Sequence, residues 1–222
     1  MDSWLLHAYL TLILGRPGYG KSTLAIRYLL NSPAAGRFIY DHQGRDGPRI
    51  SSIFPWVRTC YTANELEASL PWHWSIFNPC RMFPDDLTYR KGFEFFGQWV
   101  YDACRRGPGK KYFLINEVNE FQDRDEISPK FAQLVLRSRE YDIEPVLCAQ
   151  RPHKVNDAIT GAHTEVICFN VGESVEGVSA IDPALKKVES LGIAASEVRT
   201  LVKGQYIARN RDSGQILRGK LF

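Results

Sequence analysis

Residues 15–22 read Gly15-Arg16-Pro17-Gly18-Tyr19-Gly20-Lys21-Ser22, and this stretch matches every fixed position of the pattern G-x-x-x-x-G-K-[ST]. An apolar run precedes it over residues 8–14, and a helical pattern follows it over residues 23–30. The order of strand, glycine-rich turn and helix is the one in which such a loop binds phosphate. A chance glycine turn would have to match the motif and both flanks at once. The stretch therefore predicts a binding site for a nucleoside triphosphate.

The chemistry of the loop assigns a task to its main positions. Glycines allow backbone N–H groups to converge on phosphate oxygens, and the start of the helix adds a favourable electrostatic field. We expect Lys21 to reach the β- and γ-phosphates of ATP and the Ser22 hydroxyl to bind Mg²⁺. The residues expected to surround the nucleotide are Gly15, Arg16, Pro17, Gly18, Tyr19, Gly20, Lys21, Ser22 and Thr23.

Short apolar runs alternate with helical patterns along most of the 222 residues. Strands are expected at residues 8–14, 37–41, 73–77, 112–115, 145–149 and 165–170, with a further one near 56–61. Helices are expected at residues 92–106 and 128–139, with a shorter one near 155–161. This alternation predicts an α/β fold with a mostly parallel sheet and helices on both of its faces.

The last 50 residues have a different pattern. Two helical patches, at residues 182–191 and 195–201, precede a β-hairpin with arms at 205–209 and 215–218. Basic residues are frequent there, which is a weak indication of a polyanionic partner. We expect a single domain over residues 1–222, with a core at about 8–170 and a C-terminal extension of helices and hairpin at about 171–222.

Composition favours an intracellular globular protein. Apolar residues make up 44% and charged residues 24% of the chain, and the formal net charge is only +3. The five cysteines form no C-x-x-C pair, which favours a reducing compartment. No apolar run approaches the roughly 20 residues that a membrane helix needs, so no membrane insertion is expected.

Polar residues follow two of the expected buried strands. Strand 112–115 ends in Asn116 and Glu117, and strand 145–149 ends in Gln150. In parallel sheets such strand ends meet at the edge where ligands bind. Glu117 is placed to orient a water against the γ-phosphate, and Gln150 to detect whether that phosphate is present. The less specific interpretation, a surface carboxylate and amide beyond two strands, is weakened by the phosphate loop.

Asn116 departs from the usual pattern, in which an aspartate at this position holds Mg²⁺ through a water. An amide oxygen still accepts a hydrogen bond from that water, but it carries no charge. We expect Asn116 to assist Ser22 at the metal with lower affinity, or to be structural only. A catalytic glutamate after one strand and a polar sensor after the next are typical of the additional-strand (RecA/ASCE-like) P-loop NTPases.

Three stretches together resemble the HerA/FtsK superfamily of DNA-pumping ATPases. They are Val118-Asn119-Glu120-Phe121, Leu136-Arg137-Ser138-Arg139-Glu140-Tyr141-Asp142 and Pro145-Val146-Leu147-Cys148-Ala149-Gln150-Arg151-Pro152. The resemblance covers residues 8–170. The size of the chain is similar to that of genome-packaging ATPases of membrane-containing icosahedral viruses. The motifs also resemble the zonular-occludens-toxin-like assembly ATPases of filamentous phages.

The resemblance implies a homo-oligomeric ring, expected to be a hexamer, with nucleotide at the subunit boundary. An arginine from the neighbouring subunit would then stabilise the γ-phosphate charge. Arg139 is the first candidate and Arg137 the second. For each, the alternative is a cation favoured by the C-terminus of its helix.

The same resemblance implies DNA as the partner. The protein would contact the DNA phosphates rather than the bases, and so would bind irrespective of sequence. Arg151, His153 and Lys154, or the basic C-terminal hairpin, are the candidate contacts, although for His153 a solvated loop is the favoured explanation. Capsid or membrane-vertex proteins are further partners, and the host cytoplasm or the virion is the expected location.

Three functions remain open at this point. The first is an ATPase motor that packages double-stranded viral DNA. The second is a phage extrusion motor for single-stranded DNA, and the third is a nucleotide-dependent binding switch with little hydrolysis, which only Asn116 supports.

Overall fold

The computed structural model describes residues 9–122, 124–172 and 182–222. The described residues form a nine-stranded sheet in the order β3-β4-β2-β5-β6-β1-β7-β8-β9. The strands are β1 (Thr11–Leu14), β2 (Gly36–Tyr40), β3 (Thr59–Cys60), β4 (Trp74–Phe77), β5 (Lys111–Ile115), β6 (Ile143–Ala149), β7 (Glu165–Cys168), β8 (Gln205–Asn210) and β9 (Ile216–Lys220). Neighbours from β3 to β7 pair in parallel, while β8 and β9 are antiparallel.

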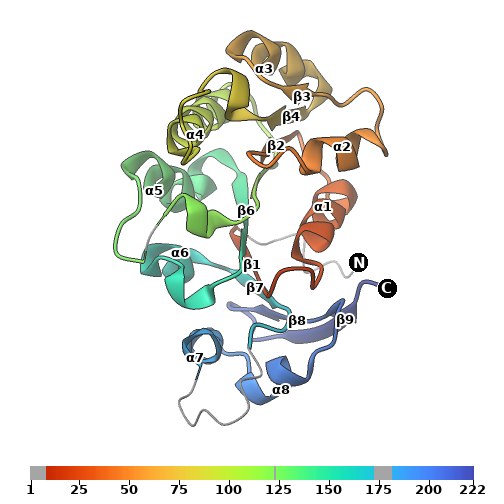
Figure 1. The fold of residues 1–222 in the computed structure, drawn as a ribbon, viewed down its shortest axis with the longest axis vertical. Helices are drawn as coiled ribbons and strands as arrows, with labels where there is room; N and C mark the ends of the chain where they lie inside the picture. The colour runs from red at the N-terminus through yellow and green to blue at the C-terminus, as the bar shows by residue number, and fades with distance from the viewer. Residues whose placement is uncertain (1–8, 123, 173–181) are drawn as a thin grey trace.

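Helices cover both faces of this sheet (Figure 1). The α-helices are α1 (Lys21–Asn31), α2 (Asp46–Ser51), α3 (Ala63–Ser69), α4 (Arg90–Arg105), α5 (Pro129–Leu136), α6 (Asp157–Ala162), α7 (Pro183–Ser190) and α8 (Ala195–Thr200). Short 3-10 turns are η2 (Leu70–Trp72), η3 (Pro79–Arg81), η4 (Val118–Glu120), η5 (Ser138–Tyr141) and η6 (Pro152–Lys154). The predicted α/β class, a mostly parallel sheet between helices, is confirmed.

Two apolar cores separate at the sheet because side chains alternate along each strand. In β1, Leu12 and Leu14 point into the core beneath α4 to α8, whereas Ile13 points into the core beneath α1 and α2. All four residues of β1 and all seven of β6 are buried, as expected of strands covered on both faces. The central strands are therefore a rigid platform for the loops that follow them.

The strand order places β6 between β5 and β1. Thr11 to Leu14 of β1 pair with Val146 to Ala149 of β6, and Leu114 and Ile115 of β5 pair with Val146 and Leu147. The three strands run in the same direction, so their carboxyl ends lie side by side. This order is the one expected of an additional-strand NTPase.

The C-terminal hairpin extends the main sheet. β8 pairs with β7 antiparallel, and β9 pairs with β8. The last residues return toward the glycine loop, since the Arg27 guanidinium donates to the Leu221 carbonyl at 2.8 Å and the Gly204 N–H donates to the Tyr19 carbonyl at 3.2 Å. The predicted hairpin is thus present and joined to the core.

Several predicted boundaries shift. The first strand, expected at 8–14, spans Thr11–Leu14, and its first residue lies outside the described part of the chain. The helix expected to run to Arg139 ends at Leu136, because the Ser138 hydroxyl donates to the Val135 carbonyl at 3.0 Å and competes with helical hydrogen bonding. Arg139 accordingly lies in the 3-10 turn η5 and not in α5.

Two helices were not predicted. α2 lies in the segment after β2, for which no helix was predicted, and α3 begins at a capping box of Thr62 and Glu65. Each spans only six or seven residues, too few for a helical apolar pattern to be recognised. In the part of the chain that the structure describes, none of the helices has both the length and the apolar character to cross a bilayer.

Candidate functional site

The glycine loop is tied to two strand ends. The Gly15 N–H donates to the Ala149 carbonyl at 3.2 Å, and the Arg16 N–H donates to the Asn170 carbonyl at 2.9 Å. Gly20 caps α1 with a left-handed backbone (φ 115°), a conformation that glycine adopts without strain. Because glycine has no capping side chain, the first N–H groups of α1 are presented to an anion.

Lys21 is the first residue of α1 and its side chain points back along the loop. Its Nζ donates to the Arg16 carbonyl at 3.1 Å, and the residue is only 7% exposed. Burial lowers the pKa of Lys21, while the charge of Glu117 opposes that shift. The ammonium is therefore held at the loop by a neutral carbonyl, in a place where a phosphate would be a stronger partner.

Glu117 and Gln150 meet at the ends of β5 and β6. The Gln150 N–H donates to Glu117 Oε1 at 3.1 Å. Glu117 has a left-handed backbone (φ 64°), which is uncommon for a residue with a side chain and typical of functional sites. Burial raises the pKa of Glu117, and the Gln150 N–H and the Lys21 charge counteract the shift. These contacts hold a carboxylate beside the lysine.

Asn116 makes a hydrogen bond that its sequence position did not predict. Its Nδ2 donates to Asp46 Oδ2 at the start of α2. Its other amide atom, Oδ1, is buried and has no partner among the described residues. Asp46 is 4% exposed, and burial, together with the nearby Asp41 charge, raises its pKa to about 6.

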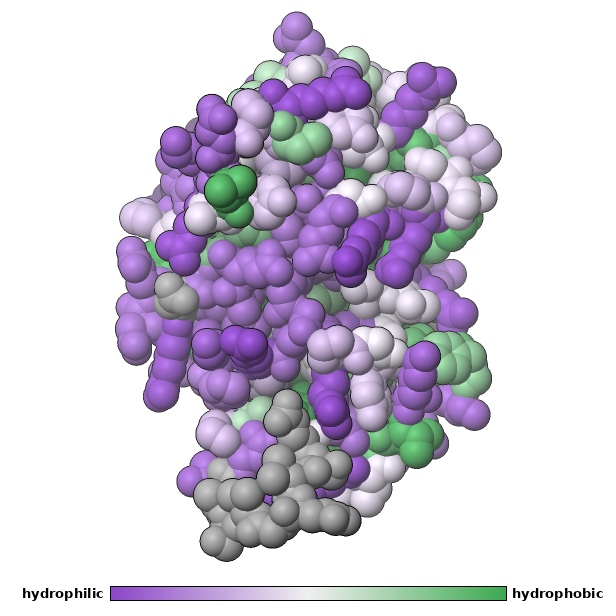
Figure 2. Space-filling model, viewed as in Figure 1, coloured by the Kyte–Doolittle hydropathy of each residue, from purple (hydrophilic) through white to green (hydrophobic). Residues whose placement is uncertain are grey.

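These groups line one cleft of about 520 Å³ at the carboxyl edge of the sheet. From the predicted site it includes Pro17, Gly18, Gly20, Lys21, Ser22, Thr23, Asn116, Glu117 and Gln150. Gly15, Arg16 and Tyr19 do not line the cleft, but their backbone N–H groups donate hydrogen bonds that hold the loop. Figure 2 shows the face of the molecule that carries the strand ends, and its surface is mainly hydrophilic.

Sequence reasoning missed part of the cleft. The segment after β2 contributes Asp41, His42, Gln43, Arg45, Asp46 and Arg49, and the C-terminal region contributes Lys203 and Phe222. His42 Nε2 lies 2.6 Å from Glu120 Oε2, which joins the loop after β2 to the one after β5. One signal in the sequence could have indicated the contribution of the segment after β2. The expected strand 37–41 ends in an aspartate, just as the expected strand 112–115 is followed by the polar residue Asn116.

Three oxygen-bearing side chains that line the cleft fit Mg²⁺. The Ser22 hydroxyl, the Asp46 carboxylate and Asn116 Oδ1, which has no partner among the described residues, are hard oxygen donors, the type that Mg²⁺ prefers. Mg²⁺ also keeps several waters when it binds, so few protein ligands suffice.

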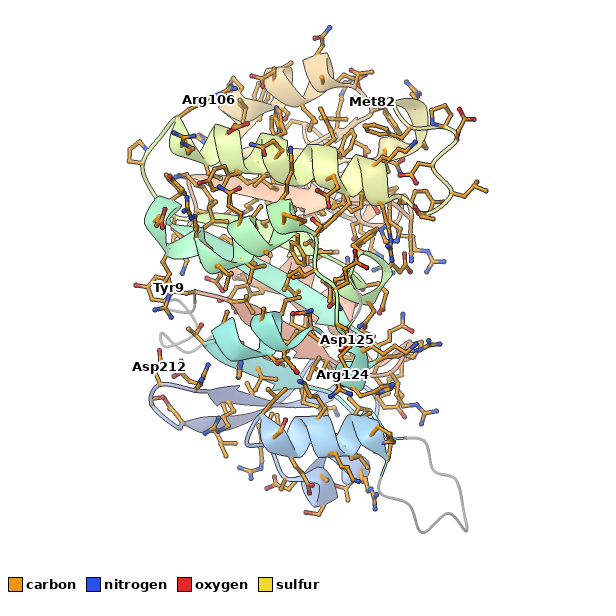
Figure 3. All side chains as sticks on the ribbon, turned by 90° about the vertical axis from the view of Figure 1, so that its left-hand side faces the viewer. Tyr9, Met82, Arg106, Arg124, Asp125 and Asp212 are labelled. Atoms are coloured by element: carbon orange, nitrogen blue, oxygen red, sulfur yellow. The ribbon has the colours of Figure 1, made fainter. Side chains whose placement is uncertain are left out.

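Arg137 and Arg139 lie at the other end of the sheet. Both precede β6, whose carboxyl end carries Gln150. Arg139 stacks over the Tyr9 ring, with Cζ 4.6 Å from the ring centroid, and both arginines are exposed. Figure 3 shows Tyr9 at one edge of the molecule and Arg124, from the loop beyond η4, at the opposite edge. Both arginines therefore lie on the side of the sheet where β6 begins, away from the cleft at its carboxyl end.

The candidate DNA contacts lie next to the cleft. Arg151 and Lys154 are exposed around η6, directly after Gln150, while His153 is half-buried. The Arg151 N–H donates to Asn119 Oδ1 at 3.4 Å and the Lys154 carbonyl accepts from Gln122 Nε2 at 3.2 Å, so η6 is linked to the loop that follows Glu117.

The glycine loop, the sheet order and the cleft define a P-loop NTPase fold of the additional-strand type. Comparison with solved structures agrees. The genome packaging NTPase B204 from Sulfolobus turreted icosahedral virus 2, in complex with AMPPCP, superposes with a TM-score of 0.72 at 16% identity, covering 96% of this chain and 97% of that one.

The DNA-packaging ATPase B204 from Sulfolobus turreted icosahedral virus has a TM-score of 0.69 at 19% identity, over 96% of this chain and 97% of that one. VirB4 of Thermoanaerobacter pseudethanolicus has a TM-score of 0.62 at 11% identity, over 96% and 89%. A scan against protein-family models and a search of curated proteins find no match. The resemblance predicted from the motifs is thus confirmed at the level of the fold.

Proposed function

We propose that the protein is an ATPase that translocates DNA and packages double-stranded viral DNA. The proposal rests above all on one observation, the convergence of Lys21, Glu117 and Gln150 on a single cleft at the carboxyl edge of the sheet. It is supported by the likeness of nearly the whole chain to a genome packaging NTPase with an ATP analogue. An ATPase of this kind would bind the nucleotide within its own cleft and act on DNA as part of an assembly.

In this proposal each residue at the cleft has a separate task. The Lys21 ammonium leaves the Arg16 carbonyl and binds the β- and γ-phosphate oxygens with charge-assisted hydrogen bonds. The Glu117 carboxylate orients the attacking water and accepts its proton. Gln150, whose N–H already holds Glu117, links the state of the γ-phosphate to the loop of Arg151 to Lys154. Mg²⁺ held by Ser22 and Asn116 would neutralise charge on the phosphates.

Completion of the site requires a second subunit. Arg139, with Arg137 as the alternative, would contribute a positive charge to the neighbour's γ-phosphate, since both lie before β6, at the end of the strand away from the cleft. A homo-oligomeric ring, proposed to be a hexamer, meets this requirement. Phosphate contacts from Arg151 and Lys154 would allow movement along any sequence.

The test is steady-state ATP hydrolysis with Mg²⁺, measured alone, with duplex DNA and with single-stranded DNA of equal nucleotide concentration. The proposal expects turnover that duplex DNA stimulates most. Stimulation by single strands alone would favour an extrusion motor. Negligible phosphate release under all three conditions would contradict the proposal and favour a nucleotide-dependent switch.

A further inference from the structure

Position 116 has an amide where the metal-associated residue of this fold usually has a carboxylate, yet a carboxylate lies beside it. Asp46 Oδ2 accepts a hydrogen bond from Asn116 Nδ2 across 70 residues of sequence. The two residues are brought together because β2, which leads to α2, is the direct neighbour of β5.

The position of Asp46 is set by the backbone around it. The Asp41 carboxylate accepts hydrogen bonds from the N–H groups of Arg45, Asp46 and Gly47, at 2.8, 3.1 and 2.8 Å. Both Asp41 oxygens are thereby engaged in holding the start of α2. Asp46 is left as the acidic side chain that faces Asn116.

The hydrogen bond also fixes which way the Asn116 amide points. Because Nδ2 is turned to Asp46, the acceptor Oδ1 must point away from it, and Oδ1 is buried without a partner among the described residues. Asn116, Asp46 and Ser22 line the same cleft. An acceptor that is oriented, buried and unused matches what a metal-bound water needs.

The charge of Asp46 is poorly neutralised within the protein. Among the described residues it forms an ion pair with Arg49, with Nη1 3.9 Å from Oδ1, and that arginine side chain is 54% exposed, while Arg45 adds a second nearby positive charge. A negative charge that is 4% exposed and adjoins a nucleotide cleft therefore has room for a stronger cationic partner.

We propose that Asp46 is a positioning residue for the divalent cation, acting through Asn116. Asp46 holds the amide so that Oδ1 faces the water shell of the cation, and it supplies from the second layer the negative charge that Asn116 lacks. The proposal rests on the proposed function, because it presumes that the cleft binds a nucleotide with Mg²⁺. The alternative is that the hydrogen bond between Asn116 and Asp46 only joins α2 to the end of β5. It would then stabilise the fold and have no effect on the binding of the cation.

The experiment compares the affinity of a fluorescent ATP analogue in Mg²⁺ with its affinity in EDTA, without turnover. The ratio of the two affinities is the Mg²⁺ enhancement. We expect Asp46→Asn to reduce this ratio about tenfold, the size typical when an outer-shell partner of a metal site is removed, while affinity in EDTA stays unchanged. The control, Asp85→Asn, removes an exposed carboxylate elsewhere and should keep the wild-type ratio.

The exchanged variant, Asp46→Asn with Asn116→Asp, retains one carboxylate and one amide in swapped places. It should recover most of the Mg²⁺ enhancement. If Asp46→Asn does not fold, the exchanged variant alone decides, since an enhancement near that of the wild type supports the proposal and its loss overturns it.

Two further results would overturn the proposal. One is an unchanged Mg²⁺ enhancement in Asp46→Asn, and the other is an equal loss of affinity in Mg²⁺ and in EDTA, which indicates a purely structural bond. Absence of any Mg²⁺ enhancement in the wild type would instead contradict the proposed function itself.

Discussion

Lys21 and Glu117 are oppositely charged and partly or wholly removed from water at the same edge of the sheet. Burial lowers the pKa of Lys21 and raises that of Glu117, and each charge opposes the shift of the other. Each charge therefore favours the ionised form of the other group. An anionic ligand would replace only the neutral Arg16 carbonyl at Lys21, a favourable exchange.

A second buried acidic group lies at the opposite end of the strands. Glu165 is fully buried near Glu144, and the Thr11 hydroxyl lies 2.8 Å from Glu144 Oε1 and 3.3 Å from Glu165 Oε2. Lys110 Nζ forms an ion pair with Glu144 at 2.8 Å. Burial, and then the Glu144 charge, raise the pKa of Glu165 to about 8. Glu165 is therefore protonated in the folded protein at neutral pH.

We expect Glu165→Gln to become progressively more stable than the wild type as the pH rises from about 5 to about 8. In the unfolded chain a glutamate loses its proton near about pH 4.3, so over this range the unfolded wild type holds fewer protons than the folded one. Wild-type stability then falls with pH, by at most about 1.4 kcal/mol per pH unit, whereas glutamine has no proton to lose. Urea unfolding across this range measures the difference.

The matched control for this prediction is Glu189→Gln, an exposed glutamate on α7. It shows what the same exchange does to stability at an exposed position over the same pH range. A constant difference between Glu165→Gln and the wild type would show that Glu165 is ionised in the folded state.

At the scale of elements, the start of α1 packs against Phe169, which follows β7, and against Leu221 near the end of the chain. A Cβ atom on Gly20 would lie 2.6 Å from Leu221 Cδ1 and 3.4 Å from Phe169 Cε1. Gly18, two residues earlier, also has a positive φ, of 79°, but a Cβ there would have nothing within 4 Å. A comparison of substitutions at the two glycines therefore distinguishes the effect of backbone strain, which both share, from the effect of close packing, which only Gly20 has.

Gly20→Ala should therefore lower both the stability of the fold and the affinity for nucleotide more than Gly18→Ala does. Both variants carry backbone strain of about 1–2 kcal/mol, the range for a non-glycine residue at positive φ, but only Gly20→Ala also displaces Leu221. We expect nucleotide affinity to fall at least about tenfold in Gly20→Ala, equivalent to about 1.4 kcal/mol. Thermal unfolding and nucleotide titration measure both effects, and equal losses in the two variants would contradict the packing explanation.

The elements that the sequence predicted well are those with a strong local signal. Residues 112–115 of β5 and 145–149 of β6 are continuous apolar runs, and the glycine loop has its own motif, so the meeting of Lys21, Glu117 and Gln150 at the carboxyl edge of the sheet could be anticipated. Asp46 could not, because its partner Asn116 is 70 residues away and only the order of β2 and β5 brings them together. The contact of the C-terminal hairpin with the glycine loop is equally non-local.

At the scale of the whole molecule, the sheet separates the two sets of residues to which we assign a function. The cleft lies at the carboxyl ends of the strands, and Arg139 lies before β6 at their amino ends. A single subunit therefore contains both halves of the proposed site but cannot bring them together. Only contact between the amino edge of one subunit and the carboxyl edge of another would complete it.

Mixing two inactive variants should restore hydrolysis if Arg139 acts on a neighbouring subunit. The Lys21→Ala variant lacks the lysine proposed to bind phosphate but keeps Arg139. The Arg139→Ala variant keeps Lys21 but lacks the arginine. In a mixed assembly some interfaces would contain both wild-type residues, so activity should exceed that of either variant alone. The matched comparison mixes Lys21→Ala with Arg137→Ala in the same way. If Arg139→Ala alone hydrolyses ATP as fast as the wild type, Arg139 does not have this role.

The central claim is that the cleft at the carboxyl edge hydrolyses ATP with Glu117 as the base. Glu117→Gln keeps the size of the side chain and its ability to accept the Gln150 N–H hydrogen bond, but removes the carboxylate. The direct measurement is ATP affinity and turnover in this variant beside the wild type. We predict unchanged affinity with turnover reduced at least about a hundredfold, the contribution of a general base. Turnover that survives the substitution would contradict the assignment.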